Sequence, residues 1–205
     1  MPYPAQTLKS ARHHLLKSDK IMRSIVKRVG PCQITTKRDR FVALAASIVS
    51  QQISGAAART VWGRLESALL PDPVSPEAVA RFSIERLRDV GISRQKATYL
   101  LDLSEKCLNG DIELNKIARL ENEGVIENLT RVKGIGRWTA QMFLMFSLCR
   151  EDVLPVDDLG IKTAIKTEYE LSELPNSKQI ESIAQPWRPY ATIACWYLWR
   201  SLENR

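Results

Sequence analysis

The sequence contains few of the residues from which metal sites and nucleophilic sites are commonly built. Its 205 residues include only two histidines and four cysteines. No cysteine pair has C-x-x-C spacing, so zinc ribbons and local iron–sulfur ligation have no support. His13 and His14 are adjacent in a polar stretch and are expected to be solvated. The expectation is therefore a protein without metal or cofactor. The cysteines are Cys32, Cys107, Cys149 and Cys195.

Long apolar runs are also missing, and acidic residues are outnumbered by basic ones. No stretch approaches the length of a membrane span, and residues 1–5 do not begin a secretory signal. We therefore expect reduced thiols in an intracellular compartment. The net charge is +7 and the isoelectric point is about 9.4. This charge favours an acidic partner such as nucleic acid, although solubility alone accounts for it equally well.

Alternating polar and apolar residues, the pattern typical of strands, are absent, and helical spacing dominates. The sequence therefore predicts an all-α fold. Cap signals at Ser54, Ser75 and Ser93 predict three helix starts, and the short strand-like piece at 32–36 is expected to be a loop. The other expected helices span about 41–49, 139–148, 160–169, 177–184 and 190–202.

Residues 129–140, LTRVKGIGRWTA, are typical of a helix end, a tight turn with two glycines and a second helix start. Gly134 and Gly136 permit backbone angles forbidden to other residues. Amides there and at the following helix start could then converge on a phosphate. An ordinary turn between helices also favours glycine, so the glycines alone do not distinguish a phosphate-binding turn from an ordinary one. The expected DNA-binding residues are Lys133, Gly134, Ile135, Gly136 and Arg137.

Several segments together resemble one known family. They are SIVSQQIS at 47–54, the hairpin with Trp138, DVLPVDDLGIK at 152–162, and WRPYA at 187–191 followed by Trp196 and Tyr197. In this combination the chain resembles the helix-hairpin-helix (HhH-GPD) DNA glycosylase superfamily. Within it, the chain is most similar to 3-methyladenine DNA glycosylase II, the alkylpurine glycosylases. The resemblance covers roughly residues 40 to 200.

The resemblance implies a single two-lobed helical domain over 1–205, with the DNA cleft between its lobes. The inner lobe would span about 35–135 and end in the hairpin. The second lobe would comprise 1–34 and 141–205, without an N-terminal sheet domain. The implied activity is hydrolysis of the N-glycosidic bond of alkylated purines in duplex DNA, of the 3-methyladenine and 7-methylguanine type. The resemblance also implies an intracellular monomer that initiates base excision repair. It would be associated with DNA in the cytoplasm or nucleoid, or in the nucleus if the source is eukaryotic.

The acidic pair at 157–158 provides the candidate catalytic group. In proteins resembling this one the second aspartate is catalytic, which corresponds to Asp158. Breaking the bond between base and sugar builds positive charge on the deoxyribose, and a fixed carboxylate stabilises that charge. The alternative is that Asp157 and Asp158 only cap the helix expected from Gly160; this alternative suits Asp157 best.

Aromatic residues are the candidates for a base pocket. Glycosylases that also cut the strand place a lysine at the position of Trp138, where it forms a Schiff base. The resemblance therefore implies no lyase activity. An indole can also stack on a cationic base. Trp196 is expected to lie off the buried stripe of the last helix, with Thr192 and Trp199, and to form a second wall. Met142 is expected to line the same pocket.

The resemblance places the DNA wedge in Gln51, Gln52 and Ile53, which would fill the gap left by an extruded base. The alternative for adjacent glutamines is a polar helix end. Two functional alternatives also remain open: a glycosylase for another lesion, such as a deaminated or etheno base, and a non-catalytic DNA-binding module.

Overall fold

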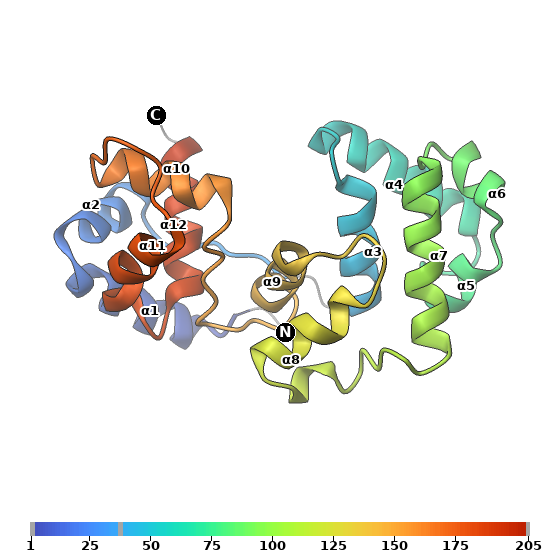
Figure 1. The fold of residues 1–205 in the computed structure, drawn as a ribbon, viewed down its shortest axis with the longest axis horizontal. Coiled ribbons are helices and arrows are strands. Elements are labelled where there is room, and N and C mark those ends of the chain that lie inside the picture. The colour runs from blue at the N-terminus through green and yellow to red at the C-terminus, as the bar shows by residue number, and fades with distance from the viewer. Residues whose placement is uncertain (1–2, 37–38, 204–205) are drawn as a thin grey trace. The chain divides into compact units, whose positions relative to one another are not determined.

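The computed structural model describes residues 3–36 and 39–203. These residues form helices joined by loops and contain no strand, so the all-α prediction is confirmed. The chain divides into two compact units (Figure 1). We call Met1–Thr36 with Leu144–Arg205 the terminal unit and Lys37–Phe143 the central unit. The division falls within α9 (Arg137–Phe146).

The terminal unit is built around the last helix. Its elements are α1 (Ala5–Ser18), α2 (Lys20–Val29), α10 (Leu159–Glu168), α11 (Ser177–Ala184), the 3-10 turn η2 (Gln185–Trp187) and α12 (Ala191–Glu203). Helices α1, α2 and α10 pack against α12. Every residue of α12 from Ala191 to Leu198 is buried. The expectation that Thr192 and Trp196 lie off the buried stripe is therefore wrong, because neighbouring elements cover the helix on several sides.

The central unit is organised around α7. Its elements are α3 (Arg40–Ser50), α4 (Gly55–Leu69), α5 (Pro76–Ala80), α6 (Ile84–Asp89), α7 (Arg94–Leu108), the 3-10 turn η1 (Ile117–Arg119) and α8 (Asn122–Thr130). Helices α3, α5 and α6 pack against α7. Ala97, Leu100 and Leu103 of α7 are buried there.

The three helix starts predicted from serine caps are confirmed. Ser54, Ser75 and Ser93 accept a hydrogen bond from a backbone amide in the first turn of α4, α5 and α7. Residues 32–36 form no regular element, as expected. Helix α9 begins two residues before the predicted start at 139 and ends two residues before 148. Within the described ranges, none of the helices combines the length and apolarity needed to cross a membrane.

Candidate functional site

The turn between α8 and α9 depends on one glycine rather than two. Gly134 has φ +80°, and a Cβ atom there would lie 2.0 Å from the ring of Tyr99. Only glycine fits this position. Gly136 has no positive φ, and a Cβ atom there would meet nothing within 4 Å. Of the two glycines that permit such backbone angles, only Gly134 adopts one.

Some of the hairpin amides are already used within the protein. The amide of Lys133 donates to Oδ2 of Asp102 at 2.9 Å, and that of Ile135 donates to the carbonyl of Val132 at 3.1 Å. In the described part of the chain, the amides of Gly134 and Gly136 donate to no backbone carbonyl. These two amides are thus the candidates for holding a phosphate, whereas those of Lys133 and Ile135 stabilise the turn itself.

The basic side chains of the hairpin lie beside acidic partners that the sequence did not reveal. Arg137 donates to both carboxylate oxygens of Glu123 on α8, at 2.8 and 2.5 Å. The Lys133 ammonium lies 3.7 Å from Asp102, whose other close cation is Lys106 at 2.7 Å. The hydrogen bonds from Arg137 hold the pKa of Glu123 below its usual value. Phosphate therefore has to compete with a carboxylate for Arg137.

Replacing Glu123 with glutamine is expected to raise affinity for duplex DNA, because it removes the negative charge that competes for Arg137. The salt dependence of binding should steepen by roughly one unit of log K against log[salt]. Fluorescence anisotropy with an undamaged duplex at several salt concentrations measures both quantities. Glu127→Gln is the matched control, since it removes the same charge from an exposed residue of α8. Equal effects in both variants would mean that only net charge matters.

The predicted wedge segment is a turn joining α3 to α4, and its residues differ in their surroundings. Gln51 is half-buried, and its side-chain Nε2 donates to the carbonyl of Gly134 at 2.8 Å. Gln52 has φ +56°, a left-handed conformation that is uncommon outside glycine. Gln52 is exposed, and Ile53 is 39% exposed. Gln52 and Ile53 are therefore the accessible members of the segment, while Gln51 links it to the hairpin.

Asp158 is the N-cap residue of α10 and is only 8% exposed. Its Oδ1 accepts from the amide of Ile161 at 2.7 Å and from the indole nitrogen of Trp199 at 3.0 Å. The capping role expected mainly for Asp157 therefore belongs to Asp158. The side chain of Asp157 is 73% exposed and lies 3.6 Å from Lys162. A capping carboxylate can still act on a substrate, because capping uses one oxygen.

The loop that leads to Asp158 is attached to the start of α12. The hydroxyl of buried Thr192 donates to the carbonyl of Arg150 at 2.6 Å and accepts from the amide of Val153 at 3.0 Å. The amide of Thr192 donates to the carbonyl of Glu151 at 3.0 Å. Sequence reasoning missed this role because Thr192 is far from Asp158 in the chain. A polar residue among apolar ones in a helix was the available signal.

The three candidate pocket residues have different exposures. Trp138, in the first turn of α9, is 50% exposed, which is unusual for an indole among the described residues. Met142, one turn further along, is half-buried. Trp196 is buried; its ring meets that of Tyr197 at 5.1 Å, and the guanidinium of Arg200 lies 5.5 Å from its centroid. Trp138 therefore suits a stacking role as it stands, whereas Trp196 is packed by its neighbours.

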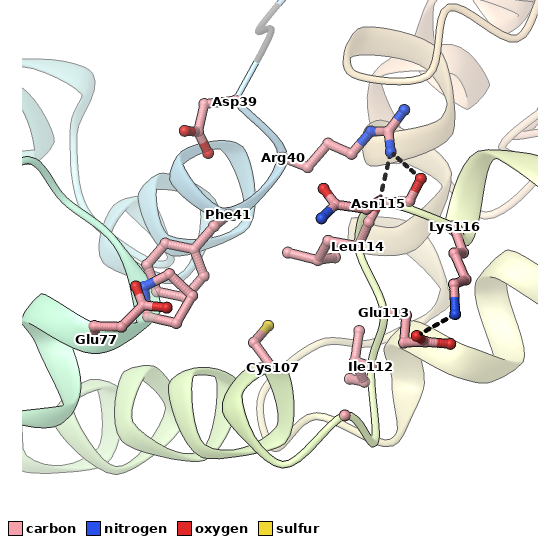
Figure 2. A pocket seen from close by; sticks show the side chains of 12 residues that line it. Asp39, Arg40, Phe41, Glu77, Cys107, Ile112, Glu113, Leu114, Asn115 and Lys116 are labelled. Carbon is pink, nitrogen blue, oxygen red and sulfur yellow. Dashed lines mark hydrogen bonds and ion pairs between the residues drawn. The ribbon is translucent and has the colours of Figure 1, made fainter.

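A pocket of about 710 Å³ in the central unit lies away from the predicted site residues. Figure 2 shows Arg40 reaching toward the loop at Leu114 and Asn115, whose carbonyls accept from its guanidinium at 2.5 and 3.2 Å. Burial raises the pKa of the Cys107 thiol in this pocket to about 11. Among the residues that the structure describes, no group of three potential ligands could hold a metal ion.

The helical hairpin between α8 and α9, within an all-helical chain, defines a helix-hairpin-helix protein. The chain belongs to the HhH-GPD superfamily of base excision DNA repair proteins, whose family model matches residues 45–189. It is 32% identical over 197 residues to the alkylbase DNA glycosidase-like protein mag2 of Schizosaccharomyces pombe, covering 94% of this chain and 92% of that protein.

Solved structures show the same relationship. The 3-methyladenine DNA glycosylase Mag1 of Schizosaccharomyces pombe, in complex with abasic DNA, gives a TM-score of 0.82 at 33% identity over 95% of this chain and 97% of that chain. The DNA-3-methyladenine glycosidase of Bacillus halodurans gives 0.83 at 36% identity, covering 93% and 88% of the two chains.

Proposed function

We propose that this chain is a monofunctional DNA glycosylase that removes alkylated purines, of the 3-methyladenine and 7-methylguanine type, from duplex DNA. The observation that carries the proposal is the carboxylate of Asp158, buried and hydrogen-bonded at the start of α10. Membership of a base excision repair family and relatives named for 3-methyladenine support it. The protein acts as a monomer, without metal or cofactor.

In the proposed reaction, the bond between C1′ of deoxyribose and the base nitrogen breaks, and its electron pair leaves with the base. The carboxylate of Asp158 stabilises the positive charge that develops on the sugar. Water then adds to C1′ and gives up a proton, with the carboxylate as acceptor. An alkylated purine is already cationic, so it leaves without a separate strong acid. The product is an abasic site in an unbroken strand.

The remaining candidate residues bind and expose the base. The amides of Gly134 and Gly136, with Lys133 and Arg137, hold the DNA backbone. Gln52 and Ile53 occupy the gap left by the extruded base. Trp138 stacks on the cationic base, an attraction worth about 0.5–2 kcal/mol, with Met142 one helical turn further along α9. Because residue 138 carries no amine, the enzyme forms no Schiff base there and does not cut the strand.

Base release from methylated duplex DNA tests this proposal. The expected result is free 3-methyladenine and 7-methylguanine by chromatography, with strands that break only after heating in alkali. Release from duplexes with a deaminated or etheno base, but not from methylated DNA, would show that the substrate is one of those lesions and not an alkylated purine. Strand cleavage without alkali would contradict the absence of lyase activity. Duplex binding with no base release from any lesion would identify a non-catalytic binding module.

A further inference from the structure

Gly160 lies where the side chains of Asp158 and Trp199 meet in the terminal unit. A Cβ atom there would lie 3.0 Å from Oδ1 of Asp158 and 3.0 Å from both Cδ1 and Nε1 of Trp199. Glycine in a helix costs about 1 kcal/mol relative to alanine, so its presence in the first turn of α10 needs a reason. The close approach of the Trp199 indole to the carboxylate provides that reason.

The carboxylate of Asp158 is held by donors from two different helices. Capping of α10 requires only the amide of Ile161, which donates to Oδ1 at 2.7 Å. The indole N–H of Trp199, on α12, adds a second bond to the same oxygen at 3.0 Å. An aspartate held from one side by its own helix can still rotate about χ1 and χ2. A second donor from another helix restricts both torsions.

Trp199 is itself fixed in place. Its ring packs on that of Phe146 with 6.0 Å between centroids and 34° between planes. Its helix, α12, is buried along most of its length. The indole therefore presents its N–H in one direction, and the carboxylate it holds has one orientation.

We propose that Trp199 is a positioning residue for the catalytic step, which acts through Asp158 and not on the DNA itself. This inference rests on the proposed function, in which Asp158 is the carboxylate beneath the sugar. A reacting group that is displaced or free to rotate loses much of the rate gained from fixed geometry. The Trp199 hydrogen bond thus contributes to turnover and not to the affinity for DNA.

Trp199→Phe is the informative variant, because phenylalanine keeps a ring against Phe146 and removes the N–H donor. The expected result is a fall in kcat for base release of about 10-fold to 100-fold, with unchanged KM and unchanged affinity for an abasic duplex. Trp62→Phe is the matched control, since it removes an indole N–H that donates to Glu66 in the central unit. That variant should retain the full rate.

A second variant and a double-variant cycle separate positioning from loss of structure. Gly160→Ala introduces a methyl group against the same hydrogen bond and should lower kcat with Trp199 intact. In an Asp158→Asn background, Trp199→Phe should cause no further loss, because its effect passes through the carboxylate. Thermal unfolding of each variant checks that the fold is retained.

The outcomes distinguish the inference from the proposed function. If Asp158→Asn lowers base release about 10²–10⁴-fold and Trp199→Phe leaves kcat unchanged, the positioning role is wrong and the proposed function stands. If Trp199→Phe lowers the rate equally in both backgrounds, Trp199 acts independently of Asp158 and the inference also fails. Full activity of Asp158→Asn would overturn the catalytic assignment itself.

Discussion

Asparagine in place of Asp158 is expected to lower the rate of base release by about 10²–10⁴-fold while leaving the fold intact. In the proposed reaction, the substitution removes the negative charge that stabilises the sugar cation and the group that accepts the proton of water. Asparagine caps helices about as well as aspartate, so α10 should still start at the same residue. Single-turnover base release from a methylated duplex measures the loss, and thermal unfolding reports on the fold.

Asp157→Asn is the control for that experiment, because it removes the same charge from the neighbouring, exposed residue. Its rate should match that of the unchanged protein. Binding of Asp158→Asn to an abasic duplex should also persist, since the hairpin residues remain. Undiminished base release by Asp158→Asn would show that the carboxylate is not the catalytic group.

Alanine in place of Gly134 is expected to lower the free energy of unfolding by about 2–5 kcal/mol. About 1–2 kcal/mol comes from a left-handed backbone at a residue with a Cβ. A further 1–3 kcal/mol or so comes from overpacking against Tyr99, whose ring lies 2.0 Å from the ideal Cβ position. Denaturant unfolding measures the change, and weaker binding to duplex DNA should accompany it because the hairpin is distorted.

Gly136→Ala is the matched substitution for that comparison. A Cβ atom there meets nothing within 4 Å, so the loss in unfolding free energy should stay within about 1 kcal/mol, the usual cost of a poorer helix start. If both variants lost the same stability, the contact between Gly134 and Tyr99 would not account for the effect.

The fold was predictable because local signals agree with one another along this chain. Serine caps, first-turn proline and helical spacing located α4, α5 and α7 to within a residue or two. The hairpin was also visible, since glycine is the residue that a left-handed turn requires. What sequence could not separate was Gly134 from Gly136, because the difference depends on the ring of Tyr99, which comes from another helix.

The surroundings of the candidate site could not be predicted, since they come from residues far apart in the chain. Trp199 is 41 positions from Asp158 in the chain. Thr192, which holds the loop before Asp158, is separated from its partner Val153 by 39 positions. The interpretation of Trp196 was wrong because helical spacing locates one buried face, whereas every residue of α12 from Ala191 to Leu198 is buried. The acid paired with Arg137 was missed because Glu123 lies on the other side of the turn, on α8.

The hydrogen bond from Gln51 to Gly134 joins the turn before α4 to the turn before α9 within the central unit. The two turns are separated by more than eighty positions in the chain, and this bond couples a movement of one to a movement of the other. Under the proposed function, the spacing between the backbone-binding amides and the wedge is therefore a property of the protein alone.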